Sequence, residues 1–111
     1  MRRAAILVAA LAVLAAFALP AFAATTSVKV GDNYFIKSSG TPKLTVKKGT
    51  TVKWRWAGKA PHDVTVTKGP AKFKSKTMTS GSFSKKVTKA GTYSIICTIH
   101  QPGMKMTLVV K

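Results

Sequence analysis

The segment that decides the fold reads GTYSIICTIHQPGMKMTLVV and runs from Gly91 to Val110. Apolar side chains occupy every second position in its first and last parts: Tyr93, Ile95 and Cys97, then Met106, Leu108 and Val110. A period of two is typical of half-buried β-strands. The intervening Pro102-Gly103 pair is a turn signal. The segment therefore predicts two consecutive strands joined by a short loop.

The same alternation recurs upstream. From Thr51 to Trp56, the side chains of Val52, Trp54 and Trp56 share one face. Shorter alternating runs include Val28 and Val30, Leu44 and Val46, Val64 and Val66, and Phe83 and Val87. No window has the period of an amphipathic helix. Short strands at this spacing predict an all-β domain, an antiparallel β-sandwich or small barrel of about seven to eight strands. The Lys-, Ser- and Gly-rich segment 67–81 is expected to be a loop with at most one edge strand.

The N-terminal segment has the three parts of a secretory signal peptide. Arg2 and Arg3 precede an uncharged apolar run, and Ala21-Phe22-Ala23 ends it with small residues around the exit site. We expect residues 1–23 to be a signal peptide and residues 24–111 to be the single mature domain. An uncleaved membrane anchor is the alternative, but a cleavage site of small residues would have no function in an anchor. The expected location is therefore the periplasm or the extracellular space, without stable membrane insertion after cleavage.

The charge is strongly unbalanced. The chain has 19 Lys and Arg residues, and its only acids are Asp32 and Asp63, which gives a formal net charge of +17. Removing Arg2 and Arg3 leaves +15 on the expected mature chain. Such basic proteins often bind nucleic acid, but an exported protein does not meet it, and no aromatic RNA-binding signature is present. Two interpretations stay open: a generic basic surface, or steering toward an acidic partner or anionic envelope polymers.

Four residues form a candidate metal site: His62, Cys97, His100 and Met104. The mature chain contains one Cys and two His, so no internal disulfide can form and an unpaired thiol in an oxidising compartment calls for a reason. Each residue alone is more often structural than functional, because Cys and Met commonly pack in cores. Together, however, one thiolate, two imidazoles and a distant thioether are the donor set of a blue-copper electron-transfer site. The sequence therefore predicts one copper ion, Cu(I) or Cu(II).

Two stretches carry a family resemblance. Ala60-Pro61-His62-Asp63-Val64 and the strand-and-loop segment from Gly91 to His100 resemble the plastocyanin and amicyanin branch of the cupredoxins, the type 1 blue-copper proteins. The resemblance covers essentially the whole mature chain. It implies a Greek-key β-sandwich and one type 1 copper. It also implies that the near-surface ligand His100 is the exit for the electron, within an apolar patch that includes Pro61 and Pro102.

The chain departs from the family pattern at three places. Three residues separate His100 from Met104, whereas plastocyanins usually have four and amicyanins two. Asp63 stands where the family usually has Asn, and as an acceptor it is expected to bond the Thr98 hydroxyl or a backbone N–H. Met106 stands where a Gly commonly follows the axial Met, and it therefore competes with Met104 as the axial ligand.

These features predict a monomeric, exported protein that shuttles single electrons between redox partners. The alternative is a copper carrier or store of the cell envelope that uses the same ligands. We do not expect an enzyme, because multicopper catalysis needs further His clusters and the two acids leave no evident Cys-His-Asp triad. The expected partner is a redox protein with an acidic docking surface, and Lys59 and Lys105 flank the ligand segments as candidate rim residues.

Overall fold

The computed structural model describes residues 24–36 and 41–111, so the signal peptide expected at residues 1–23 lies outside the described residues. The described residues form eight strands and no helix that could span a membrane. The strands are β1 (Thr25–Gly31), β2 (Tyr34–Phe35), β3 (Lys43–Val46), β4 (Thr50–Trp56), β5 (Thr65–Lys68), β6 (Ser82–Val87), β7 (Gly91–Ile96) and β8 (Lys105–Val110).

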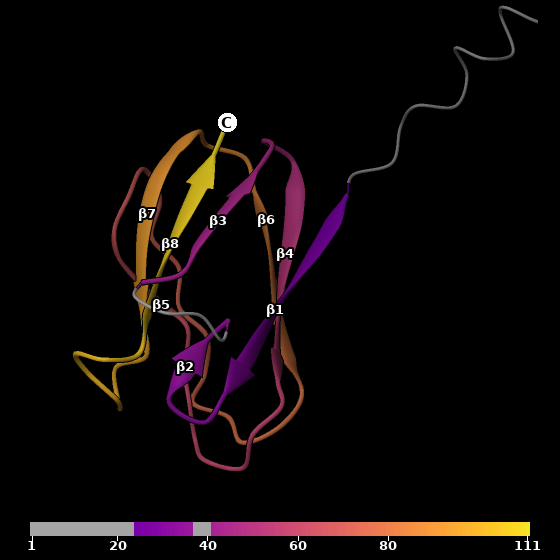
Figure 1. Ribbon diagram of the computed structural model, residues 1–111. Coiled ribbons are helices and arrows are strands. Elements are labelled where there is room, and N and C mark those ends of the chain that lie inside the picture. The colour runs from indigo at the N-terminus through magenta and orange to yellow at the C-terminus, as the bar shows by residue number, and fades with distance from the viewer. Residues whose placement is uncertain (1–23, 37–40) are drawn as a thin grey trace, which may run out of the picture.

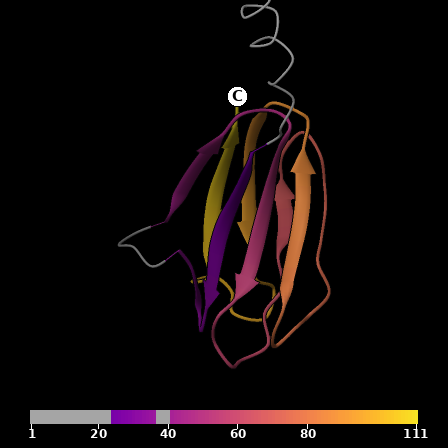
Figure 2. The ribbon, with the colours of Figure 1, turned by 90° about the vertical axis from the view of Figure 1, so that its right-hand side faces the viewer.

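Two four-stranded sheets face each other across one core (Figure 1). One sheet has the order β2-β1-β4-β6 and the other the order β3-β8-β7-β5. Figure 2 shows β1, β4 and β6 side by side in the first sheet. The all-β Greek-key sandwich and its strand number are therefore confirmed.

The sheets are mixed, and the expectation of a purely antiparallel sandwich was wrong on this point. β1 pairs with β4 in parallel, and β3 pairs with β8 in parallel, while the other pairings are antiparallel. The reason is the path of the chain. After β2 it crosses to the second sheet for β3 and then returns for β4, so β4 arrives in the same direction as β1. The alternation of apolar side chains indicates which face of a strand is buried, but it does not indicate which strands pair with it.

Most of the core consists of the alternating side chains that the sequence singles out, and Phe35 on β2 is added to them. Val52 and Trp54 on β4 are fully buried, and Trp56 is nearly so. On the opposite sheet, the buried faces of β7 and β8 are adjacent, because Tyr93 pairs with Leu108 and Ile95 with Met106. This apolar layer lies between the sheets and stabilises the sandwich through removal of its side chains from water.

Two segments are less regular than the patterned strands. β2 has two residues, and the sequence pattern did not indicate it, because two residues are too few to show a period. Segment 67–81 is mostly loop, as expected, but it contributes two isolated β-bridges, Met78 with His62 and Lys74 with Thr65. The segment thus lies alongside His62 and the beginning of β5.

We expect the core to carry most of the stability of the metal-free protein. Leu108→Ala should lower the free energy of unfolding by about 2–5 kcal/mol, because it opens a cavity in a fully buried layer. Its neighbour Thr107 is half-buried on the other face of β8, and Thr107→Ala should cost less than about 1 kcal/mol. Urea denaturation of the two metal-free variants measures both values. Equal losses would show that the two faces of β8 do not differ as the burial pattern indicates.

Candidate metal centre

His62 lies in the connection between β4 and β5 and is fully buried. Its backbone N–H donates to the carbonyl of Met78 at 2.9 Å, and the N–H of Met78 donates back to His62 at 3.0 Å. This reciprocal pair of hydrogen bonds is the isolated bridge with segment 67–81. Both bonds fix the backbone from which the imidazole projects.

Cys97 follows β7 directly and opens the loop that ends at Met104, before β8 begins. The N–H of Cys97 donates to the carbonyl of Met104 at 3.0 Å, and the N–H of Met104 donates to the carbonyl of His100 at 3.1 Å. Cys97 and Met104 are buried, whereas His100 is partly exposed. The loop is therefore closed on itself, with one candidate ligand near the surface.

The structure brings three predicted ligands together. One donor atom from each of His62, Cys97 and His100 lies within 4.8 Å of the others. Nδ1 of His62 and Nδ1 of His100 are 3.2 Å apart, and the Cys97 sulfur lies 3.5 Å from Nδ1 of His100 and 4.0 Å from Nδ1 of His62. A thiolate and two imidazole nitrogens converging on one point suit copper in both of its common oxidation states. The residues present therefore fit one copper ion.

Met104 and Met106 are both buried next to this loop. Met106 pairs with Ile95 inside β8, and its side chain alternates with the same buried set as Leu108 and Val110. Met104 precedes β8, and its backbone is hydrogen-bonded to Cys97 and to His100. The backbone contacts thus place Met104 within the loop and Met106 within the sheet.

The buried carboxylate of Asp63 joins the His62 segment to the Cys97 loop. Its Oδ1 accepts from the backbone N–H of Thr98 at 2.9 Å and from the Thr65 hydroxyl at 3.2 Å. The Thr98 hydroxyl also donates to Oδ2. The contact expected between Asp63 and Thr98 is therefore present, and it uses both the hydroxyl and the backbone N–H.

Sequence reasoning missed Asp32, which also contacts the site. Asp32 lies in the two-residue turn between β1 and β2, and its Oδ1 lies 3.1 Å from Nε2 of His62. The same carboxylate accepts from the backbone N–H groups of Ala60, at 2.9 Å, and Lys59, at 3.0 Å. The bonds from Ala60, His62 and Lys59 lower the pKa of Asp32 to about 2, so its carboxylate is ionised at neutral pH. The sequence feature that could have drawn attention to Asp32 is the scarcity of acidic residues, since it is one of two acids in the chain.

The surface residues proposed from the sequence surround the ligand segments. Lys59, Pro61, Pro102 and Lys105 are all exposed. Between Cys97 and His100, Ile99 is 47% exposed, which is unusual for a large apolar side chain in this structure. The exposure of Ile99 could not be predicted from the sequence, because it depends on the direction of the loop.

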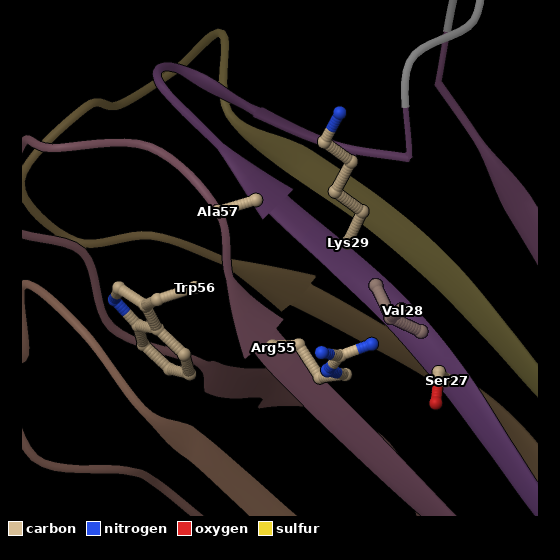
Figure 3. Close-up of a pocket in the computed structure, with 6 residues that line it drawn as sticks. All are labelled: Ser27, Val28, Lys29, Arg55, Trp56 and Ala57. Carbon is tan, nitrogen blue, oxygen red and sulfur yellow. The ribbon is translucent and has the colours of Figure 1, made fainter.

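A separate hollow of about 370 Å³ lies where β1 and β4 run side by side (Figure 3). Its lining consists of Ser27, Val28, Lys29, Arg55, Trp56 and Ala57. The charged side chains among these are cations, and none of the six is a His, Cys, Asp or Glu that could bind a metal. Among the described residues, the group of side chains that could hold a metal ion is that of His62, Cys97 and His100.

Comparisons with known proteins identify a copper-binding family. The family model of copper-binding proteins of the plastocyanin/azurin family matches residues 24–111. Amicyanin-alpha of Methylorubrum extorquens is 36% identical over 110 residues, which cover 92% of this chain and 88% of that protein.

Solved structures give the same result for the fold. The Cu(I) form of a methionine-to-alanine mutant of amicyanin superposes with a TM-score of 0.66 at 35% identity, covering 85% of this chain and 88% of that one. A copper-containing nitrite reductase from Thermus scotoductus superposes with a TM-score of 0.65 at 26% identity. That match covers 78% of this chain but 22% of the reductase, so the likeness concerns one part of the larger enzyme.

We predict that Met104, and not Met106, is the axial ligand. Met104→Leu should raise the reduction potential of the bound copper, because it removes a weak donor that favours Cu(II). A tenfold change in the affinity of the site for Cu(II) relative to Cu(I) corresponds to about 59 mV for a one-electron couple. We expect a shift of the reduction potential on this order. Met106→Leu nearly conserves volume and should cost less than about 1.5 kcal/mol of stability while leaving the potential unchanged. Voltammetry and electron paramagnetic resonance distinguish the two, and the reverse pattern would identify Met106 as the ligand.

Proposed function

This chain belongs to the plastocyanin/azurin family of copper-binding proteins, and we propose that it is an exported, monomeric carrier of single electrons with one type 1 copper. The observation that carries the proposal is the convergence of His62, Cys97 and His100 within 4.8 Å. We propose these three residues as the strong ligands and Met104 as the axial ligand. When bound, copper supplies the redox chemistry by alternating between Cu(I) and Cu(II).

The protein's contribution is to hold the ligands and to control access. Cys97 and His62 are fully buried, so their donor atoms are shielded from water, whereas His100 is partly exposed. We propose that the electron enters and leaves at His100. Exposed Ile99, Pro61 and Pro102 lie in the segments that flank the ligands and suit a small apolar contact with a partner.

The burial of the ligands favours a shuttle over a copper carrier or store. A carrier must release its metal to another protein, which requires ligands that the acceptor can reach. Here both Cys97 and His62 have no exposed surface. An enzymatic role has less support, since the chain contains no His besides the two proposed ligands. We therefore propose that the protein is not an enzyme.

Export is proposed from the N-terminal sequence alone. Residues 1–23 have the charge and apolar pattern of a cleavable signal peptide, and residues 24–111 are the segment that the copper-binding family model matches. The proposed location of the mature protein is the periplasm or the extracellular space. No nucleic acid is expected to be its partner there.

The visible spectrum after addition of Cu(II) tests the function. We expect an intense absorption band in the orange-red, because a Cys thiolate bound to Cu(II) transfers charge to the metal. Cys97→Ser should abolish the band and the redox activity, yet circular dichroism should show an intact fold, since the apolar core lies between the sheets. A pale blue solution of the wild type would refute type 1 ligation. An unfolded Cys97→Ser variant would refute the independence of the fold from the metal.

We further predict that electron exchange with an acidic redox protein is electrostatically steered. Lys59 and Lys105 are exposed beside the ligand segments, so changing both to Glu should slow the second-order rate by about tenfold at low salt. The effect should shrink at high salt because mobile ions screen exposed charges. The double change of Lys47 and Lys48 to Glu is the control with the same change in charge, since both are exposed in the turn between β3 and β4, away from the Cys97 loop. A rate that is indifferent to ionic strength would leave the basic surface without a role in docking.

A further inference from the structure

We propose that Asp32 is a positioning residue for His62, and that its negative charge lowers the reduction potential of the copper. The inference rests on the proposed function only for the second part. The first part concerns a contact within the chain, between a carboxylate on the β1–β2 turn and an imidazole 30 residues away.

The two ring nitrogens of His62 face different groups. Nε2 lies 3.1 Å from Oδ1 of Asp32, while Nδ1 lies 3.2 Å from Nδ1 of His100 and 4.0 Å from the Cys97 sulfur. An ionised carboxylate can only accept hydrogen bonds, so the contact requires a proton on Nε2. A neutral imidazole then has its free lone pair on Nδ1. Asp32 thereby selects the nitrogen that faces the other two ligands.

The Asp32 carboxylate is itself held in place by the backbone. The N–H groups of Lys59 and Ala60 both donate to it, and these residues lead directly into the His62 segment. Gly58 leaves the necessary space, because a Cβ at that position would overlap Oδ1 and Cγ of Asp32. On the other side, the two-residue turn is completed by Asn33 with a φ of 72°, a conformation that Asn adopts more readily than most residues. A fixed carboxylate can hold the ring orientation of a metal ligand.

The charge of Asp32 acts through the same contact. It is hydrogen-bonded to a ligand, and Asp32 and Asp63 are the only acids in a chain of formal charge +17. A nearby negative charge stabilises the more positive oxidation state, which is Cu(II), and therefore lowers the potential. The side chain of Asp32 is 47% exposed, so water weakens this effect without removing it.

Nuclear magnetic resonance of the metal-free full chain tests the positioning role. In the wild type we expect the His62 ring proton on Nε2, with slow exchange against water. Asp32→Asn keeps an acceptor oxygen and should keep this signal. Asp32→Ala removes the acceptor, and exchange should become about tenfold faster, as expected for loss of a hydrogen bond to a charged group. A wild-type His62 with its proton on Nδ1 instead would overturn the positioning role.

Gly58→Ala provides an independent test that leaves the number of charges unchanged. The added Cβ must displace the Asp32 carboxylate, so the Nε2 proton should exchange as fast as in Asp32→Ala. Circular dichroism and the free energy of unfolding verify that each variant is folded. If Gly58→Ala kept the slow exchange of the wild type, the proposed arrangement of Asp32 would be wrong.

The reduction potential of the copper-loaded protein tests the role of the charge. Asp32→Asn should raise it, because the variant keeps the hydrogen bond and loses the negative charge. Thr88→Lys is the control. It changes the net charge by the same amount at an exposed position before β7, at the opposite end of that strand from Cys97. A rise in Asp32→Asn no larger than in Thr88→Lys would overturn the electrostatic role. If the wild type showed no thiolate-copper band, the proposed function would be refuted. The exchange measurements on the metal-free protein would still show whether Asp32 accepts a hydrogen bond from His62.

Discussion

The hydrogen bonds between Asp63 and Thr98 join the two segments on which the metal centre depends. These residues are separated by 35 positions, and both the N–H and the hydroxyl of Thr98 donate to the Asp63 carboxylate. Next to them, β5 and β7 pair in antiparallel register, with Thr65 opposite Ile96. The pairing brings the ends of the two segments together, and the carboxylate fixes their separation. His62 and Cys97, each adjacent to one of the bonded residues, are thereby placed side by side.

Both acidic residues of the chain lie at the candidate metal site. The chain has two acids among 19 cations, and both acids bind the segments that carry the proposed ligands. Among the described residues, the one ion-pair contact within 4 Å is that of Asp32 with His62. The sandwich therefore depends on its apolar core rather than on surface salt bridges, which generally contribute little. Both acidic side chains contact the segments that carry the proposed ligands, and the charged residues of the remaining surface are cations.

Most of the strands, and the clustering of His62, Cys97 and His100, could be predicted from the sequence for simple reasons. Alternation over six residues, as in β4 or β8, reports burial directly, and a single Cys with two His leaves few ways to build a site. The parallel pairing of β1 with β4 could not be predicted, because it depends on a crossing between sheets that leaves no local pattern. Asp32 was missed for a similar reason. Its contacts exist only because the β1–β2 turn lies against Lys59, Ala60 and His62, and nothing near Asp32 in sequence indicates them.

We propose that His62, Cys97 and His100 bind one copper ion that changes oxidation state without changing ligands. X-ray absorption spectroscopy at the copper edge, recorded on the Cu(II) and Cu(I) forms of the same sample, tests this claim most directly. We expect one sulfur donor at short distance and two imidazole nitrogens in both forms, with small differences in bond length. A spectrum without a short copper–sulfur bond, or one in which reduction replaces an imidazole by another donor, would contradict it.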